Sequence, residues 1–191
     1  MKQIRRNVFE TNSSSTHSIA IPKKCEAPNN LSFSTGDFGW SFDEVDAVNY
    51  FYTAIYETSN SEIEVLEKIQ KLKSILKSHN IEYHISRPRS HTSDYDGTEY
   101  FYLDDGYIDH GYELKDFVDE LLNDEDKLLR FLSGGLVFTG NDNSNTEERC
   151  FINRDEEYLE GYDWDAHKTY PIKNPYYMSN HEDYDWYYKG N

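Results

Sequence analysis

The chain has 191 residues, enough to bury a core within one domain, and 36 acidic against 19 basic side chains give it a formal net charge of −17. Hydrophobic residues make up 37% and aromatic residues 16%, with 17 tyrosines. Acidic disordered chains are poor in aromatic residues, so this composition indicates a folded domain with a negative, partly aromatic surface. The charge excludes a conventional nucleic-acid binder, which needs clustered lysine and arginine.

Targeting and cysteine signals favour a cytoplasmic location. The sequence has no run of 18 apolar residues, and Met1 to Arg6 do not lead into the apolar core of a signal peptide. Cys25 and Cys150 lie far apart and form no Cys-x-x-Cys pair, which is typical of a reducing compartment. We therefore expect no membrane partner, no disulfide and no thiolate zinc site.

The N-terminal part of the chain has the pattern of short strands. Residues 4–10 alternate as a strand, the polar loop 11–17 interrupts the pattern, and residues 18–21 alternate again before Pro22. Residues 31–34 have the pattern of a further strand. A hairpin, or two strands joined by a polar loop, is expected at this end.

Two capping boxes predict the first two helices. Ser41 with Glu44 predicts a helix that begins at residue 41, and Ser61 with Glu64 predicts a second helix that ends near Asn80. Apolar residues follow each box at helical spacing. In the second helix, the expected buried face consists of Ile63, Leu66, Ile69, Leu72 and Leu76.

The second half of the chain repeats this mixture of strands and helices. The patterns predict strands at 81–86, 99–103 and 136–139, a polar loop at 87–97, and a helix at 113–122 that continues through 127–132. We predict an α+β fold: a single mixed domain over residues 1–154, with a small sheet and about three to four helices. An acidic, aromatic-rich extension over residues 155–191 is expected to pack on it.

One motif near the N-terminus is long and unusual: Arg5-Arg6-Asn7-Val8-Phe9-Glu10-Thr11-Asn12-Ser13-Ser14-Ser15-Thr16-His17-Ser18. It resembles the opening of a family of uncharacterised small proteins of bacteriophages, prophages and other mobile elements. The resemblance covers about residues 2–21 and implies a setting, the cytoplasm of a bacterial host, without a mechanism. Because phage accessory proteins of this size often act against host enzymes or defences, it also implies an inhibitory partner.

The loop at 11–17 carries hydroxyl and amide side chains and one imidazole between two strands. Hydroxyls and backbone N–H groups of this kind can bind a phosphate or a nucleotide, here through Asn12, Ser13, Ser14 and Ser15, while His17 can act as acid, base or ligand. The alternative interpretation is a turn in which Asn and Ser side chains cap their own backbone.

Two other polar pairs lie at the ends of elements. Asp109-His110 precedes a helix, and Asn141-Asp142 follows a strand. If Asp109, His110 and Asp142 met His17, two imidazoles and two carboxylates could hold a divalent metal with open positions. Their spacing matches no ligand motif, so solvated turns are the alternative, and the identity of any cofactor stays open. In an enzyme, the catalytic residues would be His17, Ser14, Asp109 and His110, with Asn141 and Asp142 joining the loop in ligand binding.

The acidic charge is concentrated in two segments. Residues 94–126 carry 13 acidic residues and one basic residue, and residues 155–191 carry nine acidic residues, three basic residues and ten aromatic ones. Aromatic anchors with charged rims are typical of tight protein interfaces. The alternative is a solvated acidic face with tail aromatics that cover the domain's own core. The residues expected to form the partner interface are Asp104, Asp105, Asp116, Asp119, Glu120, Trp164, Tyr184, Trp186 and Tyr187.

These patterns lead to two main functional hypotheses. The first is an acidic phage-encoded or prophage-encoded interaction protein that binds and inhibits a basic host protein, such as a nuclease or another nucleic-acid-acting defence enzyme. Surface carboxylates can imitate the phosphates of a duplex, and such binding would weaken with salt. The second is a small enzyme or a nucleotide- or phosphate-binding protein that uses the serine-rich loop and His17, with or without a divalent metal. A virion or structural component is a third possibility.

Overall fold

The computed structural model describes residues 15–39, 41, 43–95, 97–141 and 154–189. Within these residues, four α-helices and several small sheets form an α+β domain, so the predicted fold class is confirmed. The strand predicted at 4–10 lies outside the described residues. No helix in the described ranges is both long enough and apolar enough to cross a membrane.

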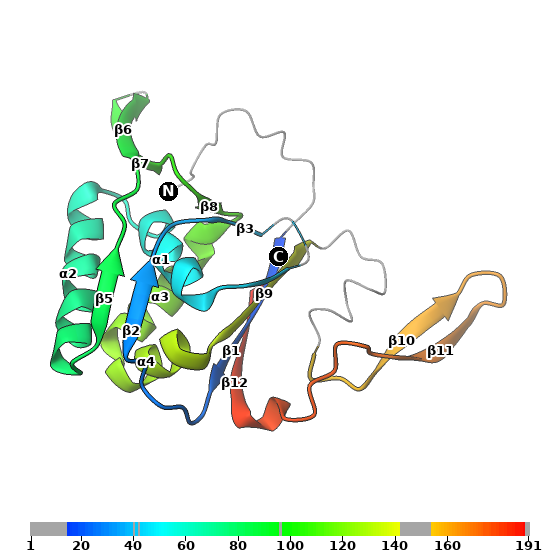
Figure 1. Cartoon of the computed structure of the whole chain (residues 1–191). Coiled ribbons are helices and arrows are strands. Elements are labelled where there is room, and N and C mark those ends of the chain that lie inside the picture. Colours follow the sequence, from blue (N-terminus) through cyan, green and yellow to red (C-terminus); the bar gives the residue numbers. More distant parts are fainter. Residues whose placement is uncertain (1–14, 40, 42, 96, 142–153, 190–191) are drawn as a thin grey trace.

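An antiparallel four-stranded sheet lies at the centre of the domain, with the strand order β12-β1-β9-β4 (Figure 1). Its strands are β1 (Ser15–Pro22), β4 (Asp43–Val45), β9 (Leu136–Asn141) and β12 (Tyr184–Lys189). Strand β12 lies beside β1, with Tyr187 opposite Ile19. The end of the 155–191 segment is therefore part of the central sheet.

Helices cover one face of this sheet. Helices α1 (Ala47–Glu57), α3 (Lys115–Asn123) and α4 (Glu125–Gly134) share the hydrophobic core with Ile19 and Val137 of the sheet. Alternate residues of a strand point to opposite faces of the sheet. The strand residues next to Ile19 and Val137 therefore face away from the helices. On that second face the rings of Phe138 and Trp186 stack, with their centroids 6.4 Å apart.

The remaining elements are attached around this body. Helix α2 (Glu62–Ser78) lies beside the parallel pair β2 (Asn30–Phe33) and β5 (Glu82–Ile85), and β3 (Asp37–Phe38) pairs in parallel with β8 (Tyr107–Ile108) (Figure 1). Two hairpins project outward: β6 (Ser90–Tyr95) with β7 (Thr98–Leu103), and β10 (Tyr158–Asp163) with β11 (Lys168–Lys173). Short 3₁₀ turns cover Gly111–Leu114 (η1) and His181–Asp183 (η2).

The two capping-box predictions have different outcomes. The helix start predicted at Ser61 is confirmed, because its hydroxyl accepts the Glu64 N–H at 3.2 Å and α2 begins at Glu62. The Glu64 carboxylate accepts the N–H of Asn60, the residue before the cap, at 2.9 Å. The helix predicted to begin at Ser41 is wrong in its start. Residues 43–45 instead pair with β9, and Asp46 caps α1 by accepting the Asn49 N–H at 2.7 Å.

Two further predictions are corrected by the described residues. Ile63 and Leu66, predicted on the buried face of α2, are instead 70% and 50% exposed, because the face that packs on the core begins at Val65. The loop predicted at 87–97 contains strand β6 instead. All six residues of β6 are exposed, so the strand has no apolar alternation that could reveal it.

Candidate functional site

The hairpin of β10 and β11 is the feature that stands out most from the domain. It extends away from the body of the molecule, on the side opposite the β6–β7 hairpin (Figure 1). Three of its aromatic side chains are largely exposed: Tyr158 at 55%, Trp164 at 79% and Tyr170 at 50%. We call residues 155–173, which contain this hairpin, the arm.

Arg154 fixes the root of the arm to the central sheet. Its guanidinium lies 3.2 Å from the Glu44 carboxylate of β4 and 4.1 Å from the centre of the Phe138 ring of β9. Its Nε also donates to the Tyr176 carbonyl at 3.1 Å. A partly buried cation over an aromatic face is stabilising, so this residue holds the arm in one position relative to the sheet.

Asn174 closes the root from the other strand. The side chain is 2% exposed, and its amide donates to the Glu156 carbonyl at 2.9 Å. Its Oδ1 accepts the Tyr176 N–H at 2.8 Å, and its own N–H donates to the Glu157 carbonyl at 2.9 Å. Two of these hydrogen bonds join the chain segments that lead into and out of the arm, and the third, with Tyr176, holds the turn that follows Asn174.

The tip of the arm is an ordered turn. Asp163 and Lys168 are the last paired residues, and residues 164–167 connect them. The Asp163 carboxylate accepts the N–H groups of Asp165 and Ala166, both at 2.9 Å, and His167 takes a left-handed conformation with φ 49°. This side-chain cap holds the Trp164 backbone in a defined turn.

The shaft of the arm has a small packed face. A side chain at Gly161 would place a Cβ 2.3 Å from Ile172 Cδ1, because the Ile172 side chain crosses over this position. Leu159, opposite Ile172, is only 3% exposed. The packed face explains how a two-stranded hairpin keeps its register while Tyr158, on the other face, remains exposed.

The other predicted aromatic contacts lie in β12 and are largely used by the fold. Tyr187 packs edge-on against Phe117 of α3, with centroids 5.4 Å apart, and Lys127 lies 4.5 Å from its ring centre. Trp186 stacks on Phe138, and its indole N–H donates to the His181 carbonyl at 3.0 Å. Tyr184, Trp186 and Tyr187 are each half-buried. Trp164 is the predicted interface aromatic that the fold leaves most exposed.

Most of the predicted interface carboxylates have cationic partners within the chain. Asp105 accepts hydrogen bonds from Nε, Nη2 and the backbone N–H of Arg89, and these bonds lower the pKa of Asp105 to about 2. Asp104 lies 2.7 Å from His91, Asp119 lies 2.9 Å from Lys115, and Glu120 is bound by Lys127. Asp116 is exposed on α3.

These carboxylates and the arm do not form one patch. The β7–β8 connection and α3 lie on the side of the body away from the arm (Figure 1). The arm itself carries six carboxylates and two lysines. It therefore has its own negative field, independent of the segment 94–126.

The predicted catalytic histidine is buried. Nδ1 of His17 lies 2.6 Å from the Tyr50 hydroxyl of α1, and both side chains are 0% exposed. Burial raises the pKa of Tyr50, so its phenol keeps its proton. The pair joins β1 to α1 across the core, and the His17 ring has no exposed surface through which to meet a substrate.

Asp109 is the predicted residue that the fold brings close to His17. Both adjoin Gly39, whose φ is +126°: a Cβ there would lie 3.1 Å from His17 Nε2 and 2.8 Å from Asp109 Cβ. The parallel pairing of β3 with β8 holds this arrangement, since the Asp109 N–H donates to the Phe38 carbonyl at 2.9 Å. His110 follows in a left-handed conformation, with Nδ1 3.9 Å from the Glu113 carboxylate.

The other residues of the predicted ligand site are placed only in part. The loop predicted at 11–17 is wrong at its end, because β1 already begins at Ser15, and Asn141 is the last residue of β9. The backbones of Ser15 and Asn141 are opposite one another in the β1–β9 ladder. Asn12, Ser13, Ser14 and Asp142 lie outside the described residues. Within the described ranges, no group of three or more His, Cys, Asp or Glu side chains could hold a metal ion.

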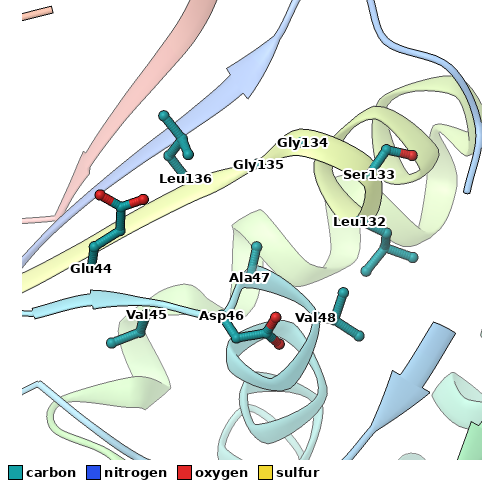
Figure 2. Close-up of a pocket in the computed structure, with 10 residues that line it drawn as sticks. All are labelled: Glu44, Val45, Asp46, Ala47, Val48, Leu132, Ser133, Gly134, Gly135 and Leu136. Atoms are coloured by element: carbon teal, nitrogen blue, oxygen red, sulfur yellow. The ribbon is translucent and has the colours of Figure 1, made fainter.

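A pocket of about 330 Å³ lies elsewhere, between β4, the start of α1 and the end of α4 (Figure 2). It is lined by residues 44–48 and 132–136, and none of the predicted site residues lines it. Its ionisable groups are the carboxylates of Glu44 and Asp46, which are already engaged with Arg154 and with the start of α1.

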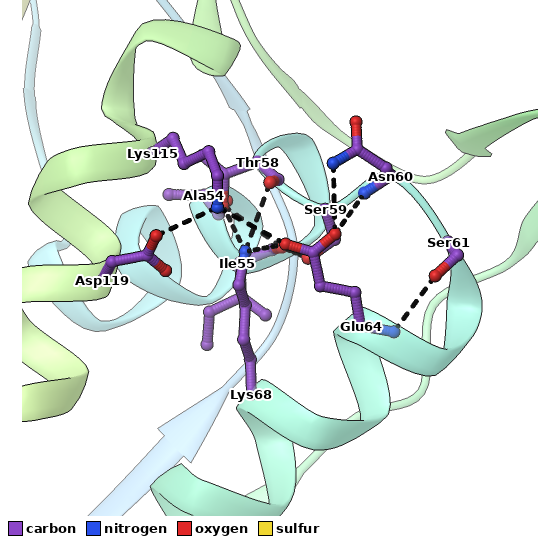
Figure 3. Close-up of polar contacts among 10 residues, drawn as sticks. All are labelled: Ala54, Ile55, Thr58, Ser59, Asn60, Ser61, Glu64, Lys68, Lys115 and Asp119. Carbon is purple, nitrogen blue, oxygen red and sulfur yellow. Dashed lines mark hydrogen bonds and ion pairs between the residues drawn. The ribbon is translucent and has the colours of Figure 1, made fainter.

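A polar cluster at the junction of α1 and α2 serves the fold (Figure 3). Lys68 is 8% exposed, donates to the Thr58 carbonyl at 3.2 Å and lies 3.0 Å from the Glu64 carboxylate. The Asn60 N–H also donates to Glu64, at 2.9 Å, and Lys115 lies 3.5 Å from it. These contacts satisfy the end of α1 and the start of α2 together.

Arg154, Asn174 and Gly39 did not emerge from the sequence as site residues. Signals for the turns near the arm are present in Asn174-Pro175 and in the aspartates on either side of Trp164, but the contact partners of Arg154 and Gly39 are distant in sequence.

No protein-family model, curated protein or solved structure matches the chain.

Proposed function

We propose that this protein is an acidic interaction protein that uses its arm to bind, and thereby block, a basic protein. The observation that carries the proposal is the arm itself: a projecting hairpin that exposes Tyr158, Trp164 and Tyr170 to solvent. Exposed aromatics on a rigid support are typical of binding surfaces, because they bury a large area at little entropic cost.

The charge of the arm supports a basic partner. Its six carboxylates and two lysines give it a net negative field at the end of an already acidic molecule. Such a field speeds association with a positive surface and repels nucleic acid. A second copy of the chain, at −17, would be repelled in the same way.

The class of partner that fits best is a nucleic-acid-acting enzyme of a bacterial host. These enzymes present lysine- and arginine-lined grooves that are shaped for a polyanion, and an acidic hairpin can occupy such a groove. The resemblance of the N-terminal motif to phage and prophage proteins supports the same setting, in which the blocked enzyme would be part of host defence.

A capture experiment with the full-length protein tests this proposal. We expect the immobilised chain to retain a basic bacterial protein at low salt and to release it at high salt or with excess duplex DNA. The purified partner should bind DNA less tightly when the chain is present. Recovery of no basic protein, or a partner whose DNA binding is unaffected, would contradict the proposal.

Two charge variants distinguish the effect of the arm's carboxylates on binding from the effect of the net charge of the whole chain. The triple variant E156Q/E157Q/E160Q removes three carboxylates from the arm, and E26Q/E67Q/E82Q removes three exposed carboxylates elsewhere. Both carry the same net charge. The arm variant should associate more slowly with the partner, while the control should associate nearly as fast as the unmodified chain.

A further inference from the structure

Trp164 is the most exposed large hydrophobic side chain in the described part of the protein, at 79%. It lies at the end of the arm farthest from the root, in the turn that joins β10 to β11. Exposure of an indole at such a position leaves a large apolar area in water.

The turn that carries Trp164 is preorganised. Two backbone N–H groups after it are bound by the Asp163 carboxylate, and Asp163 is paired in the ladder with Lys168. Because the loop is ordered before binding, less conformational entropy is lost when the indole is immobilised by a partner. This property distinguishes an anchor from an aromatic residue on a mobile loop.

The two exposed tyrosines on the shaft of the arm do not form one continuous aromatic surface. Tyr158 and Tyr170 lie on opposite faces, because Tyr170 is opposite Gly161, an odd number of residues from Tyr158. A flat partner could therefore meet only one of them. The tip is the part of the arm that can enter a cavity on the partner, and both faces of the hairpin behind it could then contact the cavity's walls.

The residues beside the indole indicate what kind of cavity on a partner could bind it. Asp163 and Asp165 flank it in the sequence, and both are exposed. An apolar cavity with lysine or arginine side chains on its rim would take the ring and meet these carboxylates, and an arginine there could also stack on the indole.

From these observations we infer that Trp164 is an anchor that inserts into an apolar cavity ringed by basic side chains on the partner protein. This inference rests on the proposed function and specifies its contact. A second copy of the chain is a poor occupant, because the pocket beside β4 presents Glu44 and Asp46 to an acidic tip.

The test compares single variants of the full-length chain for affinity to the purified partner that the unmodified chain captures. W164A should lose about 30-fold or more in affinity, since buried tryptophan anchors are typical hot spots. Y95A, at the turn end of strand β6 and 53% exposed, is the matched control and should lose less than about 3-fold. D163A keeps the indole but removes the cap, and should weaken binding by an intermediate factor.

The outcomes distinguish the anchor inference from the proposed function. Loss confined to W164A and D163A, with unchanged melting temperatures, supports the anchor. If W164A binds as well as Y95A, the anchor inference fails while the proposed function stands. If the unmodified chain captures no basic protein at low salt, both fail. A dimer of the chain that dissociates in W164A would also overturn the inference, in favour of self-association.

Discussion

The guanidinium of Arg154 and the carboxylate of Glu44 are 3.2 Å apart, although 110 residues separate them in the sequence. Their contact joins the root of the arm to the edge strand β4 of the central sheet. The direction in which the arm projects therefore depends on a side-chain contact as well as on the chain's path.

The first prediction concerns this root. R154A removes the contact with Glu44, the position over the Phe138 ring and the bond to Tyr176, so the free energy of unfolding should fall by about 1–3 kcal/mol. E44Q keeps the last two contacts and removes a pair whose acid is half-exposed, so it should cost less than about 1 kcal/mol. Urea denaturation measures both. Equal losses in the two variants would show that the ring contact and the bond to Tyr176 together contribute nothing to stability.

The second prediction concerns the buried pair of His17 and Tyr50. Y50F deletes one hydroxyl and leaves Nδ1 of His17 without this partner in a site closed to water, so the free energy of unfolding should fall by about 1–3 kcal/mol. The control Y95F changes an exposed tyrosine and should fall within about 0.5 kcal/mol of the unmodified chain. An unchanged unfolding midpoint in Y50F would refute a structural role for the pair.

The third prediction separates backbone strain from crowding at two glycines. Gly39 and Gly97 both have positive φ, of 126° and 78°, but a Cβ at Gly97 meets nothing within 4 Å. G97A should cost about 1 kcal/mol, as expected for a left-handed alanine. G39A adds a clash with Asp109 and should cost clearly more, measured by thermal unfolding. Similar costs would mean that the Gly39 neighbourhood can relax.

The sequence predicted best those features that depend on neighbouring residues. The start of α2 follows from Ser61 and Glu64, which are three residues apart, and Asn80 takes the left-handed conformation expected after the helix, with φ 57°. The separate helix α4 depends on Asp124, whose side chain accepts the Lys127 N–H, a local cap within what was expected to be one continuing helix.

Features that depend on distant contacts could not be predicted in this way. The place of β12 beside β1 depends on a pairing between residues 17–22 and 184–189. The closeness of His17 and Asp109 requires Gly39 and the parallel pairing of β3 with β8. Trp164 is exposed because the β10–β11 hairpin projects from the domain, whereas Trp186 is half-buried because β12 pairs with β1 in the central sheet. The composition of the segment 155–191 does not distinguish these two residues.

The fourth prediction concerns acid stability. Burial raises the pKa of Glu64, but hydrogen bonds from Asn60 and Lys68 outweigh it and lower the pKa from 4.5 to about 2. A carboxyl whose pKa is lower in the folded state stabilises that state above its unfolded pKa, and this stabilisation is lost as the pH falls toward 2. E64Q should therefore be less stable than the unmodified chain at neutral pH, and the difference should shrink as the pH falls below 4.5. Denaturation curves across that range measure the difference, and a constant difference would contradict the assignment.

The most direct test of the account is a hydrogen-exchange footprint of the full-length chain with and without its captured basic partner. If the arm binds the partner, new protection should appear over residues 158–173, strongest around the tip at 163–168, with little change in α2 or in the β6–β7 hairpin. Protection of α2 or of β6–β7, with the exchange of the arm unchanged, would show that the chain binds its partner through a different surface.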